Sequence, residues 1–144
     1  MSVIRDFAKD DLEPVTTLIR EVLAEFDFPF ASTFAGLFPH EAFWVAELDG
    51  EIVGTVAIRP KEGRTCELKR LYVRSSARGH GVGRALYLHA EEFARAAGYE
   101  RIWLDSSRRF VQARRLYEKM GFVLLEELDN GWEDNVYEKR LGPA

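Results

Sequence analysis

The stretch that most constrains the fold is ARGHGVGRA, residues 77–85, which places three glycines at alternate positions between two arginines. A strand-like run ends before it at Val73, and apolar residues with helical spacing follow from Val82 to Ala97. The first turn of a helix has backbone N–H groups without intrahelical partners, and glycine leaves them accessible. Together with the arginine charges, this pattern predicts a strand–loop–helix unit whose helix N-terminus binds a phosphate or pyrophosphate.

Two well-known phosphate loops fit this stretch poorly. A P-loop ends in Gly-Lys-Ser/Thr, whereas Gly83 is followed here by Arg84. A dinucleotide fingerprint needs a glycine at the position of Arg84 and begins directly after its strand, whereas a polar connection separates Val73 from Gly79. Asp105 ends the next predicted strand, where a ribose-binding carboxylate would lie. Dinucleotide binding therefore stays open as an alternative.

Length and composition indicate the general class of protein. A chain of 144 residues suits one domain, so we predict a single domain over residues 1–144. Apolar runs are shorter than the roughly 20 residues that span a bilayer, and the first residues turn acidic too soon for a signal peptide. Cys66 is the only cysteine, and the three histidines lack metal-ligand spacing. These features predict a cytoplasmic protein with no metal and no membrane partner.

The charge is unevenly distributed along the chain. The net charge is -4, but residues 59–84 contain eight basic and two acidic residues, so this segment carries +6 and the remainder -10. A basic island in an acidic chain favours one bound anion over a nucleic acid gripped along a face. We therefore predict no nucleic-acid partner, although a solvated strand and turn would give the same charge pattern.

Hydrophobic periodicity and turn residues predict the order of helices and strands. Asp10 or Asp11 is expected to cap the first helix, and Asp49-Gly50 to turn a hairpin. Leu68 and Leu71 have opposite parity in one strand, which predicts a bulge near Lys69–Arg70. The predicted segments are a strand at 2–6, a helix at 12–26, an aromatic-rich loop at 26–43, a hairpin at 43–60, a strand at 65–73, a helix at 82–97, a strand at 100–106, a helix at 111–120, and strands at 122–128 and 135–141. This order predicts an α/β (α+β) fold, a mixed sheet of about six to seven strands with helices on both faces.

Two sequence blocks resemble the GNAT (Gcn5-related N-acetyltransferase) superfamily. The block LYVRSSARGHGVGRAL, residues 71–86, resembles its acyl-CoA motif, in which a strand ends in apolar-x-Val and Arg/Gln-x-x-Gly-x-Gly/Ala opens a helix. The block ARRLYEKMGFVLLEE, residues 113–127, resembles its later helix and strand. The resemblance is tight over residues 65–128 and looser over the first helix and the hairpin. It implies a GNAT-like fold and transfer of an acetyl group from acetyl-CoA to an amine.

The resemblance also implies the residues that bind acetyl-CoA. The strand that ends at Val73 would pair with the pantetheine arm, and an N–H near Tyr72 would face the thioester oxygen. Many members have Asn at the position of Phe110, so Phe110 is expected to pack on the cofactor instead of hydrogen bonding to it. The implied set is Leu71, Tyr72, Val73, Arg78, Gly79, His80, Gly81, Val82, Gly83, Arg84, Phe110 and Tyr117.

The same resemblance implies two catalytic residues. Tyr117 aligns with the tyrosine that returns a proton to the leaving thiolate, and a phenol has a pKa of about 10. Glu67 is the candidate general base, directly or through water, because an amine with a pKa near 10.4 must lose a proton before it attacks. Two alternatives stay open: Tyr117 as a core residue with Glu67 as a solvated one, and water as the only base.

The acceptor site is implied to lie between the first helix, the loop after it and the late loop at 128–135. Phe28, Phe30 and Trp132 are the candidate substrate-binding residues, unless these aromatic residues belong to the core. The acceptor is expected to be a small-molecule or peptide amine, and a homodimer is left open. The alternative function is a non-catalytic acyl-CoA sensor, although a sensor has no use for a proton donor such as Tyr117.

Overall fold

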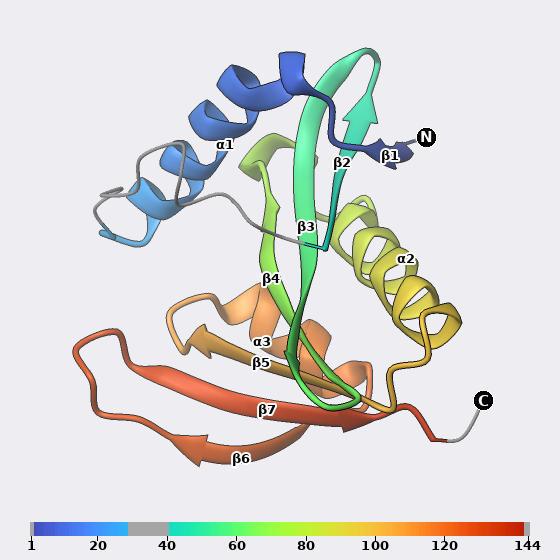
Figure 1. Cartoon of the computed structure of the whole chain (residues 1–144). Coiled ribbons are helices and arrows are strands. Elements are labelled where there is room, and N and C mark those ends of the chain that lie inside the picture. The colour runs from blue at the N-terminus through green and yellow to red at the C-terminus, as the bar shows by residue number, and fades with distance from the viewer. Residues whose placement is uncertain (1, 29–40, 143–144) are drawn as a thin grey trace.

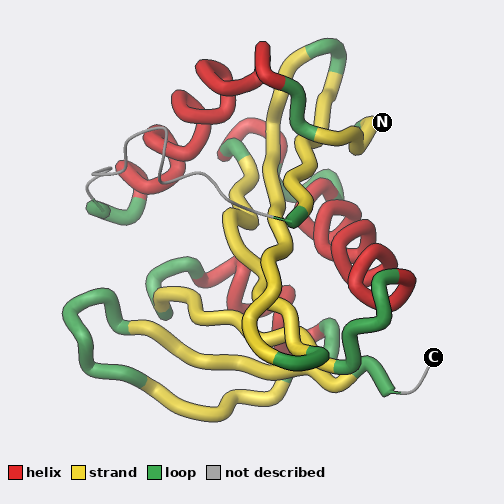
Figure 2. The backbone as a smooth tube through the Cα atoms, in the orientation of Figure 1, coloured by secondary structure: helices red, strands yellow, loops and turns green. Residues whose placement is uncertain are grey.

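The computed structural model describes residues 2–28 and 41–142, which form a seven-stranded mixed sheet with helices on both faces (Figures 1 and 2). The predicted order of elements and the predicted fold class are confirmed. Phe30 lies outside the described residues. The elements are β1 Val3–Asp6, the 3-10 helix η1 Lys9–Asp11, α1 Leu12–Glu25, β2 Ala42–Leu48, β3 Glu51–Glu62, β4 Thr65–Val73, the 3-10 helix η3 Ser75–Ala77, α2 Val82–Ala96, β5 Arg101–Ser107, α3 Val111–Lys119, β6 Val123–Glu127 and β7 Asp134–Arg140.

The strand order is β1-β2-β3-β4-β5-β7-β6, and β4–β5 is the one parallel pair within the described sheet. Figures 1 and 2 show β3 and β4 running across the direction of β5 and β7, so the sheet twists strongly where β4 meets β5. Helix α1 covers one face of β2 to β4, and α2 covers the other. The two halves of the sheet therefore diverge from the β4–β5 junction.

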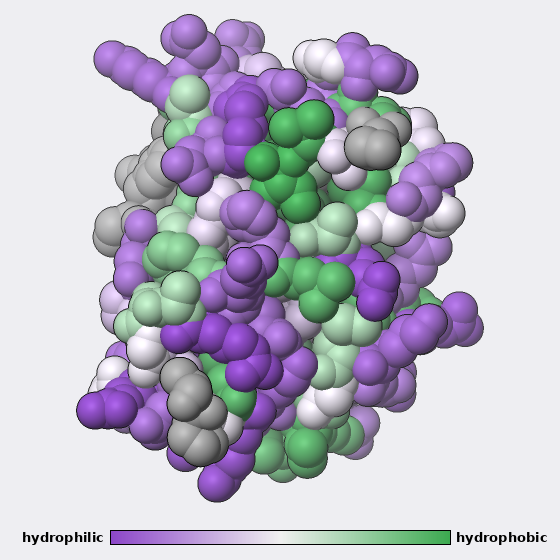
Figure 3. Space-filling view, turned by 90° about the vertical axis from the view of Figure 1, so that its right-hand side faces the viewer, coloured by the Kyte–Doolittle hydropathy of each residue, from purple (hydrophilic) through white to green (hydrophobic). Residues whose placement is uncertain are grey.

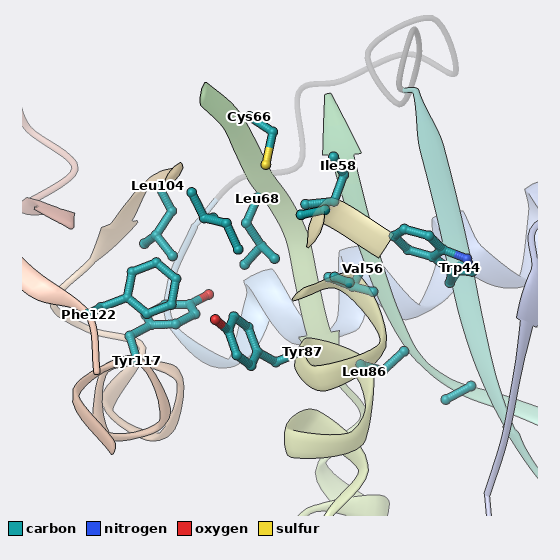
Figure 4. Packing of buried hydrophobic residues seen from close by; sticks show 14 of the residues in the cluster. Trp44, Val56, Ile58, Cys66, Leu68, Leu86, Tyr87, Leu104, Tyr117 and Phe122 are labelled. Atoms are coloured by element: carbon teal, nitrogen blue, oxygen red, sulfur yellow. The ribbon is translucent and has the colours of Figure 1, made fainter. Parts of the chain in front are cut away.

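Apolar residues at helical spacing hold the helices on the sheet. On α1, Val15, Leu18 and Ile19 are fully buried against β2 and β3. A larger cluster lies between the other face of the sheet and α2 with α3, and Figure 4 shows Leu86 of α2 and Leu104 of β5 within it. Burial of such side chains contributes about 1.5–3 kcal/mol each to folding, so both helices are firmly attached.

The start of α1 differs from the prediction in one respect. Asp11 stands at the N-cap position of α1, but its side chain makes no capping hydrogen bond to that helix. Its carboxylate instead accepts a 2.7 Å hydrogen bond from the Ala8 N–H and a 2.7 Å bond from Arg5. The Arg5 guanidinium holds the pKa of Asp11 below its usual range. The predicted helix boundary and the N-cap position of Asp11 are therefore right, but Arg5 takes the carboxylate and no side-chain capping bond forms.

The surface of the described residues is mixed in polarity. On the face shown in Figure 3, hydrophilic side chains predominate, and hydrophobic ones form separate patches. Among the helices in residues 2–28 and 41–142, none is both long enough and apolar enough to span a bilayer.

Candidate active site

The twist separates β4 from β5 and opens the sheet. The two strands are in register only at Thr65–Arg101, Cys66–Ile102 and Glu67–Trp103. Beyond these pairs the β5-facing edge of β4 is open to the backbone of a ligand. Two clefts lie along this opening: a first cleft of about 220 Å³ beside the start of α2, and a second cleft of about 380 Å³ between β4 and β5.

The predicted bulge in β4 lies at the opening. Thr55 pairs with Tyr72, but Ala57 pairs with Lys69, so β4 has one residue more than β3 between these pairs. Arg70 has a φ of 58°, which is rare for a residue with a side chain. The bulge changes the parity of the strand and lets both Leu68 and Leu71 pack with the same core cluster. This confirms the bulge that the sequence predicts.

The glycine loop leads into α2 at one end of the first cleft. Gly79 and Gly81 have φ values of 83° and 78°, which glycine adopts without strain. The missing side chains also leave room for a ligand to approach the backbone. The Ala85 N–H makes a 3.0 Å hydrogen bond to the Gly81 carbonyl. The N–H groups of residues 82–84 belong to the first turn of α2, where backbone N–H groups have no acceptor within the helix. The geometry therefore matches the anion site that the sequence predicts.

Most of the residues that the resemblance implies for acetyl-CoA line the first cleft. These are Leu71, Tyr72, Val73, Arg78, Gly79, Gly81, Val82, Gly83, Arg84 and Phe110. His80 is exposed and is not among the lining residues, and Tyr117 lines the second cleft instead. Six further lining residues were not predicted from the sequence: Val22, Phe26, Ala77, Gln112, Ala113 and Leu116. Val22, Phe26 and Leu116 are apolar residues of helices or their ends, a pattern typical of core residues, and no motif marks Ala77 or Gln112.

Arg78 connects the loop to α1. Its Nη2 lies 2.6 Å from the Glu25 carboxylate, and its Nε donates a 3.1 Å hydrogen bond to the Val73 carbonyl. Its guanidinium also lies 5.8 Å from the centre of the Phe26 ring. The arginine is therefore held at the rim of the first cleft, and Glu25 offsets part of its charge.

Tyr117 reaches the second cleft from α3. Its side chain is 4% exposed, and burial raises the pKa of its phenol, so the hydroxyl stays protonated at neutral pH. Its ring lies 5.6 Å from that of Phe122, and Figure 4 shows its hydroxyl pointing away from α3 toward Leu68. A neutral hydroxyl on a residue that lines a cleft can donate a proton or a hydrogen bond to a bound group that reaches it.

Four charged residues line the second cleft. Lys69 and Arg70 come from the bulge of β4, and Asp105 and Asp134 come from β5 and β7. Partial burial raises the pKa of Asp105, and the nearby Lys69 ammonium opposes this rise. The sequence analysis named Asp105 only as a possible ribose ligand. It lines the second cleft and not the glycine-lined one.

Glu67 lies outside both clefts as they are lined here. Its side chain is buried, with Oε1 2.8 Å from the Arg59 Nε and Oε2 3.4 Å from the Lys69 Nζ. The carboxylate therefore holds two cations beside the second cleft, and its role as general base stays a prediction. Cys66 next to it is fully buried, and this burial raises the pKa of its thiol to about 12.

A chain of aromatic rings lines part of the second cleft. Phe28 stacks on Trp132 with ring centres 5.3 Å apart, and the Phe110 ring lies 5.3 Å from Phe28. Both predicted acceptor residues within the described part, Phe28 and Trp132, thus line this cleft. Arg108 holds the loop that carries Trp132, since its backbone N–H donates a 2.9 Å hydrogen bond to the Glu133 carbonyl and its Nη1 donates a 3.1 Å bond to the Asp134 carbonyl. No sequence motif marks this arginine.

The family model of the Acetyltransferase (GNAT) family matches residues 5–122. The chain belongs to the GNAT family. The match spans α1, the glycine loop and α3, and so includes most of both clefts. The protein is accordingly an enzyme of the N-acetyltransferase class.

Two relatives show how far the likeness of this GNAT chain extends. It is 31% identical over 135 residues to the uncharacterized N-acetyltransferase YjgM of Escherichia coli (strain K12), covering 83% of this chain and 81% of YjgM. It is 44% identical over 85 residues to N-acetylaspartate synthetase of Rattus norvegicus, covering 58% of this chain. The matched part is only 28% of the synthetase, well under a third of that protein.

Solved GNAT structures share the fold along nearly the whole chain. A GNAT acetyltransferase of Staphylococcus aureus Mu50 superposes with a TM-score of 0.87 at 18% identity, covering 98% of this chain and 99% of that one. The PaiA N-acetyltransferase of Thermoplasma acidophilum, solved with coenzyme A, superposes with a TM-score of 0.78 at 22% identity, covering 97% and 99%. At these identities the likeness establishes the fold.

Proposed function

We propose that this GNAT enzyme transfers the acetyl group of acetyl-CoA directly to a bound amine in a ternary complex with both substrates. The observation that carries the proposal is that the two clefts meet. Leu71, Tyr72, Phe110 and Ala113 line both of them. A thioester held at this junction would be within reach of an amine in the second cleft, which favours direct attack.

The first cleft fits coenzyme A in the chemistry of its groups. The N–H groups at the start of α2 and the charges of Arg78 and Arg84 suit a pyrophosphate. The open edge of β4 next to Leu71 and Val73 offers backbone groups to the amides of a pantetheine arm. Bound acetyl-CoA would supply an activated acetyl thioester, and the use of acetyl-CoA by GNAT acetyltransferases supports this assignment.

Tyr117 is proposed as the proton donor to the departing thiolate. Tyr117 lines the second cleft together with Ala113 and Tyr72, which also line the first. Burial raises the pKa of the phenol, so its proton is present at neutral pH, and the phenol is a weaker acid than a solvated tyrosine. This proton donor favours turnover over the alternative of a non-catalytic acyl-CoA sensor. Asp105 lies away from the glycine-lined cleft, so the dinucleotide alternative loses its ribose ligand.

In this proposal the chain forms one catalytic domain, because residues from α1 to β7 line the clefts. The name of the relative N-acetylaspartate synthetase puts aspartate among the acceptors to be tested. Homodimer formation and a cytoplasmic location stay predictions from the sequence.

The test measures release of coenzyme A thiol from acetyl-CoA with a panel of amines, together with the affinity for coenzyme A. Tyr117→Phe should lower kcat by about 10²–10⁴-fold and leave the affinity for coenzyme A unchanged. Tyr87→Phe is the matched control, because Tyr87 is also buried and packs 5.6 Å from the same Phe122 ring but lies outside both clefts. Binding of coenzyme A without thiol release under any amine would favour the sensor.

A further inference from the structure

We infer that the acceptor is a small zwitterion, a primary amine that also carries a carboxylate, such as a free amino acid. This inference rests on the proposed function and specifies the occupant of the second cleft. It comes from the charged residues that line this cleft: the cations Lys69 and Arg70 belong to β4, and the carboxylates Asp105 and Asp134 belong to β5 and β7. A ligand with separated opposite charges matches both sets of charges at once.

The two cations lie at the bulge of β4. Consecutive residues of a regular strand point to opposite faces of the sheet, so Lys69 and Arg70 would not normally line one cleft. Both residues line the second cleft at the bulge, where Arg70 has a positive φ. Both cations belong to the basic segment of residues 59–84, which carries +6 in a chain whose net charge is -4. They suit a carboxylate on the ligand.

Lys69 is oriented as well as charged. Its Nζ lies 3.4 Å from the Glu67 Oε2, while the Arg59 Nε bonds to the other carboxylate oxygen. Glu67 is thereby fixed from two sides and is a positioning residue for Lys69. At 27% exposure, the Lys69 side chain is partly removed from water, and a ligand carboxylate would replace lost hydration.

The acidic residues suit the amine. Asp105 accepts a proton from the ammonium group of the acceptor, and the neutral nitrogen forms a bond to the carbonyl carbon of the thioester. The carbon–sulfur bond breaks, and the thiolate accepts the proton of Tyr117, which regains one from the new amide nitrogen. The products are the N-acetyl amino acid and coenzyme A thiol, with one proton passing from Asp105 to water.

The cleft limits the size of the acceptor. It holds about 380 Å³, and the stacked rings of Phe28 and Trp132 are part of its lining. A free amino acid fits this space between the rings and the junction with the first cleft. These walls favour a small molecule over a peptide chain.

The experiment compares amino acids with matched acceptors that lack the carboxylate. Thiol release is measured with L-aspartate, glycine and L-phenylalanine, with the α-amides of glycine and phenylalanine, and with methylamine and phenethylamine. We expect kcat/KM for at least one amino acid to be at least tenfold higher than kcat/KM for the matched acceptors that lack its carboxylate. Equal or faster transfer to the matched acceptors would overturn the inference and leave the proposed function standing. No transfer to any amine and no affinity for coenzyme A would overturn the proposed function itself.

A lysine substitution tests the residue that carries the inference. Lys69→Met should raise KM for the preferred amino acid at least tenfold and leave KM for methylamine or phenethylamine unchanged. Lys61→Met is the matched control, because Lys61 lies over the Trp103 ring and lines neither cleft. Equal effects of Lys69→Met on both classes of acceptor would contradict the role of Lys69. If this variant does not fold, the preference of the unaltered enzyme for carboxylates still decides the inference.

Discussion

Thr55 donates a 2.7 Å hydrogen bond from its hydroxyl to the backbone carbonyl of Arg70. The threonine is fully buried in β3, and the carbonyl belongs to the bulge of β4. The irregular pairing at the bulge would otherwise leave this carbonyl without a hydrogen-bond donor, and the Thr55 hydroxyl supplies one. It thereby holds Arg70 at a positive φ and keeps Lys69 and Arg70 beside the second cleft.

Thr55→Val should remove the hydrogen bond that holds the bulge, because valine has nearly the same shape as threonine but lacks the hydroxyl. We expect a loss of about 1–2 kcal/mol in the free energy of unfolding and a several-fold rise in KM for the acceptor, with unchanged affinity for coenzyme A. Thr16→Val is the control, since Thr16 is also buried and donates a 2.7 Å bond to the Leu12 carbonyl inside α1. A rise in KM in both variants would contradict a specific role for the bulge.

Gly81→Ala should strain the anion loop without a steric clash. A Cβ at Gly81 would meet no atom within 4 Å, so the cost is that of a positive φ, about 1–2 kcal/mol. Relief of this strain would move the N–H groups at the start of α2 and weaken coenzyme A binding several-fold. Gly63→Ala is the control, because Gly63 has a φ of 52° and the same open surroundings in the β3–β4 turn. Calorimetric titration should show weaker binding in the first variant alone.

Glu25→Gln should tighten coenzyme A binding. The Glu25 carboxylate lies 2.6 Å from Arg78 and offsets part of its charge at the first cleft. Partly exposed ion pairs contribute about 0.2–1 kcal/mol, so we expect a gain of about 1.5- to 5-fold at low salt that fades as salt is added. Glu21→Gln serves as the control, since Glu21 pairs at 3.5 Å with Arg74, outside both clefts. Unchanged or weaker binding in Glu25→Gln would count against a phosphate site at Arg78.

The pH dependence of activity should reflect Asp105. Partial burial raises the pKa of this carboxyl, Asp134 and Glu67 add to the rise, and Lys69 opposes it. As proton acceptor Asp105 must be ionised, so kcat/KM should fall toward acid at a pH above the ordinary value of about 3.9. Asp105→Asn should lower kcat/KM by about 10²-fold at neutral pH and remove this acidic limb.

The substitution Asp105→Asn should lower activity but should not lower the stability of the fold. The folded chain binds the Asp105 proton more tightly than the unfolded chain, so this group loses stabilising effect as pH rises through its raised pKa. Asp105→Asn should therefore be at least as stable as the unaltered protein at neutral pH by thermal unfolding. A less stable variant whose pH–activity profile is unchanged would contradict both the shift and the role.

Local patterns in the sequence predict the fold and the first cleft well. The glycines, the turn at Asp49-Gly50 and the apolar spacing of α1 depend on neighbours along the chain. The parity of Leu68 and Leu71 was enough to place the bulge, because alternation in a strand breaks only where a residue is inserted.

The second cleft could not be predicted in the same way. It depends on how β4 and β5 diverge and on which residues the bulge turns into the opening. Lys69 and Asp105 are far apart in sequence and belong to no shared motif, so nothing indicated that they line one cleft. Glu67 stands in the right strand for a base, but Arg59 and Lys69 hold its carboxylate outside the two clefts. The resemblance predicted Tyr117 in the site, although the cleft that it lines is the acceptor side.

The most direct test of this account is a nitrogen–proton correlation spectrum of the isotopically labelled protein, titrated with coenzyme A. We predict saturable shifts that are largest for the backbone amides of residues 79–84, with further shifts at Leu71 and Val73 on the open edge of β4. Titration with pyrophosphate alone should reproduce the shifts at residues 79–84 and leave β4 unchanged. Saturable binding with the largest shifts elsewhere, or no binding at all, would contradict the assignment of the glycine loop as the coenzyme A site.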